Sequence, residues 1–183
     1  LFDNPDLVTR SMDIVLQYND GIAAAMIDAG ADVMWLGDCV GTSHFISAEQ
    51  YSDFAAAYAK EAAKRIQDRG CMLVYHGGEL ALPHLKIMAG LGLQSMNIGY
   101  GVDLAGVKKE IGSQICLLGN LDTINDLQYV SPDHAYSATE QVILAGKPGG
   151  GYIFSTGEAI VESTPKENVH AMMRAIRDAG RYR

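Results

Sequence analysis

The sequence contains the stretch ICLLGNLD at residues 115–122, a continuous apolar run followed by a glycine and polar side chains. A strand without polar alternation is expected where both faces of a sheet are covered, as in a parallel sheet flanked by helices. The residues after such a strand lie at its carboxyl end, where parallel α/β proteins gather their chemistry. This stretch therefore predicts a buried parallel strand and a polar rim.

Four similar runs occur elsewhere in the chain, at residues 33–36, 72–75, 95–98 and 152–154. The segments between them have helical patterns with clear start signals: Ser47 and Gln50 form a capping box, and Thr164 is placed to cap a helix that opens at Pro165. We expect helices at about 7–28, 47–69, 81–89, 104–111, 131–146 and from 164 onward. One helix followed by five β-α units predicts a parallel α/β fold in a single domain over residues 1–183.

Length and charge restrict the function classes. The chain has 183 residues, 48% of them hydrophobic, and a formal net charge of −8. A domain of this size buries roughly 70% of its unfolded surface, and the acidic balance argues against nucleic acid or anionic lipid as partner. Three cysteines without a C-x-x-C pair suit a reducing compartment. No apolar run approaches the ~20 residues of a membrane span. We therefore predict a cytoplasmic protein that acts on a small molecule.

The predicted rim carries ionisable or polar side chains after every strand. These are Asp38, His76, Glu79, Tyr100, Asn120, Asp122 and Glu158, most of them beside a glycine. Each has a plain structural alternative, such as a turn cap for the aspartates and asparagine or a satisfied core histidine. The functional alternative is a pocket in which His76 and Glu158, with Asp38 or Glu79, either bind a metal ion or act as acid and base. Sequence spacing does not separate these two chemistries.

Seven short segments, taken in order, are similar to one known family. They are residues 29–32, 37–38, 46–51, 75–78, 101–104, 118–122 and 163–169. They resemble the uroporphyrinogen decarboxylase superfamily, which also contains corrinoid- and coenzyme-M-dependent methyltransferases. The resemblance implies a (β/α)8 TIM barrel, of which this chain supplies about the last five βα units. The arginine-bearing segment and the catalytic aspartate of family decarboxylases belong to the earlier part of the barrel.

The resemblance also implies two departures at the site. Family methyltransferases bind zinc through a His-x-Cys sequence and a later cysteine; here the histidine is His76, and the cysteine positions are Gly78 and Glu158. Family decarboxylases have a histidine where Glu158 stands. A thiolate-rich zinc site is therefore absent from this pattern, whereas a histidine and carboxylate site for zinc remains open.

The resemblance favours a metal-dependent methyltransferase that moves a methyl group between a small methylated substrate and a corrinoid carrier on a partner protein. We expect Asp38, His76 and Glu158 to be catalytic and His76 and Glu158 to hold zinc. We expect the substrate to contact four further side chains: Glu79, Tyr100, Asn120 and Asp122. The alternatives are a uroporphyrinogen decarboxylase and a non-catalytic fragment or binding module. Five strands leave two open sheet edges, so we also expect a homo-oligomer or completion by a missing N-terminal half.

Overall fold

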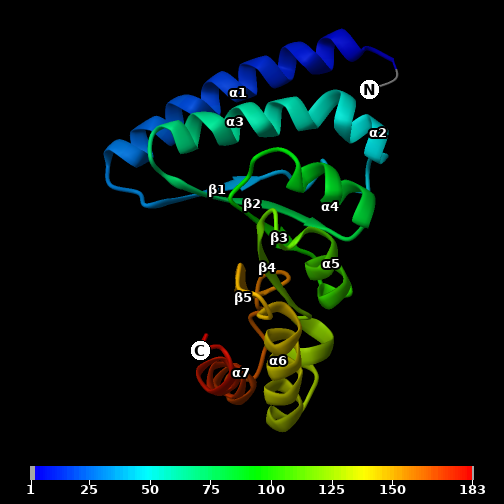
Figure 1. Ribbon diagram of the computed structural model, residues 1–183, viewed down its shortest axis with the longest axis vertical. Helices are drawn as coiled ribbons and strands as arrows, with labels where there is room; N and C mark the ends of the chain where they lie inside the picture. The colour runs from blue at the N-terminus through cyan, green and yellow to red at the C-terminus, as the bar shows by residue number, and fades with distance from the viewer. Residues whose placement is uncertain (1–2, 183) are drawn as a thin grey trace.

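Five parallel strands form one curved sheet in the computed structural model, which describes residues 3–182 (Figure 1). The strand order follows the chain, β1-β2-β3-β4-β5, with each strand hydrogen-bonded to the next. Their bounds are β1 (Val33–Gly37), β2 (Met72–Glu79), β3 (Ser95–Ile98), β4 (Cys116–Leu121) and β5 (Tyr152–Thr156). All five predicted strands are confirmed, and the sheet is left open between β1 and β5. Strands β2 and β4 are longer than predicted, so His76, Glu79 and Asn120 lie within strands and not after them.

Helices connect the strands along the outer side of this sheet (Figure 1). They are α1 (Pro5–Asp28), α2 (Ala48–Gln50), α3 (Ala56–Asp68), α4 (Leu82–Ala89), α5 (Leu104–Ile111), α6 (Pro132–Gly146) and α7 (Lys166–Ala179). Two π-helical turns, η1 (Tyr51–Ala55) and η2 (Ile124–Gln128), add to them. The alternation of helix and strand that the sequence predicts is thus confirmed.

Two helix starts test the predicted caps. The capping box between Ser47 and Gln50 forms in both directions, but the helix expected over 47–69 is divided by η1, which turns the fully buried Tyr51 inward. The cap assigned to Thr164 is wrong. Helix α7 begins at Lys166 with Pro165 at its N-cap, and the Thr164 hydroxyl is buried without a partner among the described residues.

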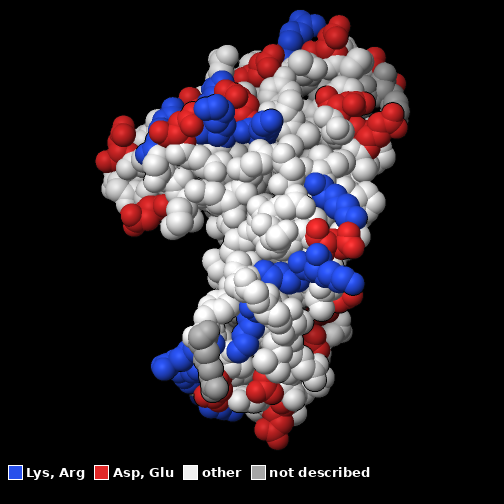
Figure 2. Space-filling view, viewed as in Figure 1, with Lys and Arg blue, Asp and Glu red and all other residues white. Residues whose placement is uncertain are grey.

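The two faces of the sheet differ in burial. Side chains that point outward, such as Leu73, Met96 and Leu117, are buried against the helices and form the main core. Side chains that alternate with them point to the concave face, where Val33, Trp35, Met72 and Ile153 are about half exposed. In a closed barrel these inward positions fill the interior. The hollow on the left of Figure 2 shows no charged side chain, in agreement with this apolar concave face.

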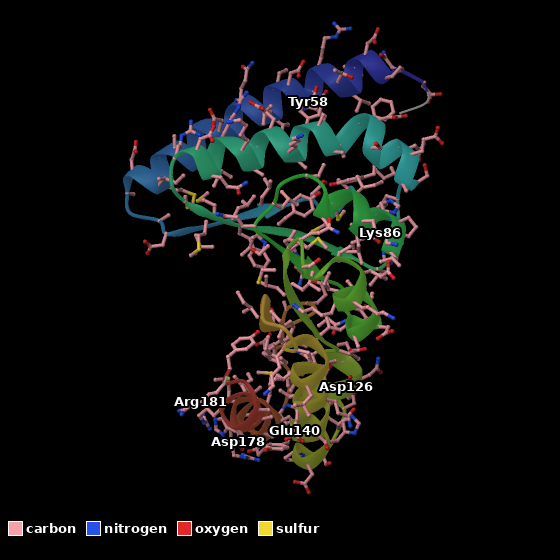
Figure 3. All side chains as sticks on the ribbon, in the orientation of Figure 1. Tyr58, Lys86, Asp126, Glu140, Asp178 and Arg181 are labelled. Carbon is pink, nitrogen blue, oxygen red and sulfur yellow. The ribbon has the colours of Figure 1, made fainter. Side chains whose placement is uncertain are left out.

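Charged side chains instead lie on the outer helices. Lys86 on α4 pairs with Glu110 on α5 at 2.7 Å, and the Tyr58 hydroxyl on α3 donates to Asp13 on α1 at 2.7 Å (Figure 3). Within residues 3–182, no helix has the length and apolar character that crossing a membrane requires.

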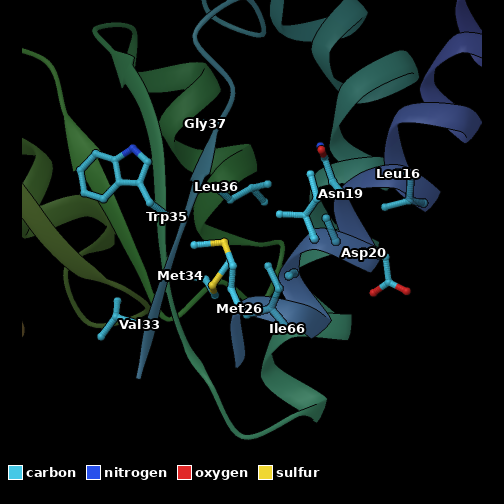
Figure 4. A pocket seen from close by; sticks show the side chains of 13 residues that line it. Leu16, Asn19, Asp20, Met26, Val33, Met34, Trp35, Leu36, Gly37 and Ile66 are labelled. Atoms are coloured by element: carbon cyan, nitrogen blue, oxygen red, sulfur yellow. The ribbon is translucent and has the colours of Figure 1, made fainter. Parts of the chain in front are cut away.

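A groove of about 420 Å³ runs between α1 and β1 at the open edge of the sheet (Figure 4). Leu36 faces α1 in this groove, while Trp35 points to the opposite side of the strand. None of the predicted site residues lines it. The groove therefore belongs to the unpaired edge and lies apart from the polar rim.

Candidate functional site

Asp38 follows β1 and is the end of a buried hydrogen-bond chain. The Tyr75 hydroxyl donates to Asp38 Oδ2, and the hydroxyls of Tyr51 and Tyr75 lie 2.9 Å apart. Because the single Tyr75 proton is used toward Asp38, Tyr51 must donate to Tyr75. Burial raises the pKa of both tyrosines well above the usual range, so both stay protonated at neutral pH. The two tyrosines hold the half-buried Asp38 carboxylate at the end of β1, in a cavity that residues of α1 and α3 also line and that contains neither His76 nor Glu158.

Glu79 ends β2 and is fully buried, with 0% of its surface exposed. Its carboxylate accepts from the amide and hydroxyl of Ser43, at 2.8 and 2.5 Å, and from the amides of Leu80 and Ala81, both at 2.6 Å. Burial alone would raise the pKa of Glu79, but the hydrogen bonds outweigh burial and lower it. The carboxylate therefore holds the loop after β1, and in this structure it has no surface for a substrate.

Asn120 and Asp122 also bind backbone in the structure. The Asn120 amide donates to the carbonyls of Gly99 and Val102, at 2.9 and 3.1 Å, and so ties the loop after β3 to the end of β4. Asp122 accepts from the amides of Ile124 and Asn125, at 2.8 and 2.9 Å. Burial alone would raise the pKa of Asp122, but these hydrogen bonds outweigh burial and lower it. Both side chains shape the rim.

His76 lies on the concave face of β2. Its ring is 4.7 Å from that of Trp35, centroid to centroid, across the neighbouring strand. The ring is half-buried, and its Nδ1 atom is buried without a hydrogen-bond partner among residues 3–182. Buried polar atoms are normally paired, so this nitrogen is available to a ligand.

Glu158 reaches across the sheet from the end of β5 to the end of β2. A Cβ placed on Gly78 would lie 3.1 Å from Glu158 Oε1 and 3.9 Å from Asn97 Oδ1. Gly78 has a φ of +60°, and it leaves space between these oxygens. The exposed Glu158 carboxylate forms no hydrogen bond or ion pair with the part of the chain that the structure describes.

Asn97 was not predicted as a site residue, yet it joins this cluster from β3. Only 3% of it is exposed, and its Oδ1 atom is buried without a partner in the described chain. The signal in the sequence was a lone amide inside the apolar run 95–98. A polar residue in a strand that is covered on both sides needs a partner, and here it faces the rim.

Tyr100 is 44% exposed on the loop after β3. A Cβ on Gly157 would lie 2.9 Å from the backbone nitrogen and the Cβ of Tyr100. The glycine thus lets the loops after β3 and β5 meet above β4. This contact fixes the backbone next to Glu158.

His76 and Glu158, the two predicted metal ligands, do not by themselves make a complete site for a divalent cation. Residues 3–182 contain no group of three or more His, Cys, Asp and Glu side chains that could hold a metal ion. The unpaired oxygens of Glu158 and Asn97 beside Gly78 are acceptors, whereas the orphaned Nδ1 of His76 accepts or donates according to the tautomer of the ring. Acceptors without a donor match a metal ion or a ligand that carries N–H or O–H groups.

A family model described as "Uroporphyrinogen decarboxylase (URO-D)" matches residues 1–179. The chain belongs to the uroporphyrinogen decarboxylase family. The expected resemblance is thereby confirmed, and with it the partial barrel of this family.

Individual relatives in the uroporphyrinogen decarboxylase family are distant. The uroporphyrinogen decarboxylase of Nitrosococcus oceani is 27% identical over 97% of this chain and 50% of the relative. The methylcobamide:CoM methyltransferase MtbA of Methanosarcina mazei is 26% identical over 97% of this chain and 51% of the relative. The chain thus spans about half the length of the curated relatives it matches.

A solved structure agrees with the fold. A methyltransferase from Methanosarcina mazei superimposes with a TM-score of 0.83 at 24% sequence identity, over 97% of this chain and 51% of that one. The five β-α units therefore have the fold of about half of that structure.

Proposed function

We propose that the chain provides the metal-binding part of a methyltransferase in which a small methylated substrate and a corrinoid carrier exchange a methyl group. The observation that carries this proposal is the convergence of Glu158 on Gly78, the position two residues after His76. Nitrogen and oxygen ligands suit zinc. A zinc ion bound there would supply Lewis-acid polarisation of the atom that carries the methyl group.

The residues of the chain would prepare this site. Glu79 fixes the loop after β1 through Ser43, and the two tyrosines orient Asp38 beside it. Asn120 fixes the loop after β3. We propose that Asp38 and Tyr100 contact the substrate, while Glu79, Asn120 and Asp122 position the backbone around it.

The proposal includes a partner that closes the barrel. The concave face is apolar, with Trp35 55% exposed, and the edge of the sheet beside β1 is unpaired. Both features favour association with another protein segment. Two copies of five strands exceed the eight of a barrel, so a segment with three further βα units fits better than a second copy. We propose this completed barrel, with a corrinoid protein as its partner, as the active form.

Metal content tests the proposal. The purified chain should hold zinc in stoichiometric amount by elemental analysis, and Glu158→Ala and His76→Ala should each lose it. Zinc that stays unchanged in Glu158→Ala would exclude Glu158 as a ligand. Methylation of reduced cobalamin by methylated amines or ethers, followed by its visible spectrum, would then test the chemistry in the completed barrel.

The second candidate is uroporphyrinogen decarboxylation, which is favoured by the names of relatives such as the Nitrosococcus oceani protein. In that case Glu158 would contact the tetrapyrrole and no metal would be needed. Decarboxylation of uroporphyrinogen that is insensitive to chelators would support it over methyl transfer. A chain that folds yet binds neither zinc nor tetrapyrrole would support a non-catalytic role.

A further inference from the structure

We propose that the exposed face of α7 is a docking surface for a carboxylate-rich segment of a partner protein. This surface, called the basic stripe from here on, consists of five side chains: Lys166, His170, Arg174, Arg177 and Arg181. The first four recur at spacings of four, four and three residues, so they share one face of the helix. Arg181 lies two residues after the end of the helix. The basic stripe is independent of the metal site and goes beyond the proposed function.

The charge of the chain is divided unevenly along the sequence. Residues 166–183 contain five Lys or Arg and two Asp or Glu, a net charge of +3, whereas residues 1–165 contain 9 Lys or Arg and 20 Asp or Glu, a net charge of −11. Figure 2 shows positive side chains gathered at the lower left, where α7 lies in Figure 1. Asymmetry of this kind is typical of a segment that binds anionic partners.

The basic stripe is exposed and unpaired. All five of its side chains are exposed, and none of them forms an ion pair within residues 3–182. On other helices basic side chains are engaged, since Arg69 pairs with Asp20 and Lys86 pairs with Glu110, each at 2.7 Å. The donors of the basic stripe are therefore available to a partner.

The two carboxylates on α7 lie beside the basic stripe. Asp178 accepts a hydrogen bond from the Tyr136 hydroxyl on α6 at 3.0 Å, so it is directed at the neighbouring helix. Glu167 is in the first turn of α7, where a carboxylate stabilises the amino end of a helix. Neither carboxylate pairs with a cation of the basic stripe within the part of the chain that the structure describes.

The basic stripe stays accessible when the barrel is completed. The buried face of α7 lies opposite to it, and there Ala171 and Met172 belong to a core cluster with Leu121 of β4 and Ala135 of α6. In a closed barrel the helices form an outer ring around the strands. The face opposite the core is therefore directed outward, and a second protein can contact it without opening the barrel.

Charge and length identify the chemistry of the partner. Three of the five side chains are arginines, whose guanidinium groups bind carboxylates in a bidentate geometry. From Lys166 to Arg177 the basic stripe extends about 16 Å along the helix, which matches about three turns of a partner helix with acidic residues on one face. An extended polyanion such as a nucleic acid fits less well, because the chain as a whole has a net charge of −8.

The test is binding of a fluorescently labelled helical peptide, with glutamates at the spacing of the basic stripe, to the 183-residue chain by anisotropy. Arg174→Glu combined with Arg177→Glu should weaken binding about 10-fold or more, because each reversal replaces an attraction by a repulsion. Lys60→Glu combined with Lys109→Glu makes the same change of net charge at exposed positions on α3 and α5. In about 0.1 M salt, charges more than about 10 Å apart are largely screened, so this control should keep the wild-type affinity.

Circular dichroism should show the wild-type helix content in every variant, since the substituted side chains are exposed. Arg174→Gln combined with Arg177→Gln removes the charge without reversing it, and it gives the same comparison if charge reversal unfolds α7. This neutral pair should also bind the peptide more weakly than the wild type.

Three results would overturn the proposed docking surface. Equal weakening in the stripe variants and in the control would show that only the net charge of the chain matters. Tighter binding of a short single-stranded RNA, or of vesicles that contain phosphatidylserine, than of the peptide would assign the basic stripe to another class of partner. A wild-type chain that does not bind the peptide would remove the surface altogether. Zinc content of the same samples tests the proposed function separately.

Discussion

Two carboxylates at the carboxyl ends of the strands, Glu79 and Glu158, lie in opposite surroundings. Glu79 is fully buried and accepts four hydrogen bonds from the loops around it. Glu158 is exposed, approaches Gly78 from the far side of the sheet, and has no partner in the described chain. The comparison separates a carboxylate that holds the loops of the rim from one that is free to bind, although Glu79 ends β2 and Glu158 lies only two residues after β5.

The largest expected effect is on folding stability at Glu79. In Glu79→Ala, the amides of Ser43, Leu80 and Ala81 lose their acceptor inside the protein, and the free energy of unfolding should fall by about 3 kcal/mol. Glu158→Ala removes no hydrogen bond and should stay within about 0.5 kcal/mol of the wild type. Urea unfolding measures both values. Equal losses in the two variants would abolish the distinction.

The next largest effect on stability is expected at Gly78, the glycine that Glu158 approaches. Gly78 has a φ of +60° and Gly101 a φ of +81°, so alanine at either position should cost about 1–2 kcal/mol of unfolding free energy. A Cβ on Gly101 meets nothing within 4 Å, whereas one on Gly78 meets Glu158 Oε1 at 3.1 Å. Zinc binding should therefore weaken in Gly78→Ala alone. The same zinc affinity in both variants would show that Glu158 is not held at that point for a ligand.

Tyr75→Phe should have a smaller effect on the free energy of unfolding. The variant loses the hydrogen bonds of the Tyr75 hydroxyl to Asp38 and Tyr51, which is worth about 1 kcal/mol. Zinc affinity should not change, because Asp38 is not among the proposed ligands. A zinc affinity that falls in Tyr75→Phe would place Asp38 in the metal site. Thermal unfolding and calorimetry provide the two measurements.

The fold was predictable because its signals are local. Five apolar runs gave the strands, and the capping box at Ser47 gave a true helix start. The turn η1 was not predictable, since it depends on Tyr51 reaching Tyr75, 24 residues away. Thr164 failed as a cap because Pro165 takes the N-cap position and α7 begins only at Lys166.

The site was predictable only as a set of positions. The rule that polar residues gather at the ends of parallel strands predicted His76, Glu79 and Glu158. It does not indicate which of these side chains has its hydrogen bonds satisfied within the chain. That difference depends on Ser43, 36 residues before Glu79, whose amide and hydroxyl reach the carboxylate. Asn97 was not predicted because it lies inside a strand between apolar neighbours, and the rule considers only the residues at the end of a strand.

The smallest effect is the acid dependence of stability, which tests the buried carboxylate of Glu79. The pKa of Glu79 in the folded chain is below its ordinary value of 4.5. The contribution of Glu79 is therefore complete above about pH 4.5 and is lost as the pH falls through the folded pKa, because the unfolded chain takes up the proton first. Glu79→Gln should remove this part of the slope, so that its unfolding free energy approaches that of the wild type in acid. A Glu79→Gln curve that keeps the wild-type slope would show that the hydrogen bonds to Glu79 do not lower its pKa in the folded chain.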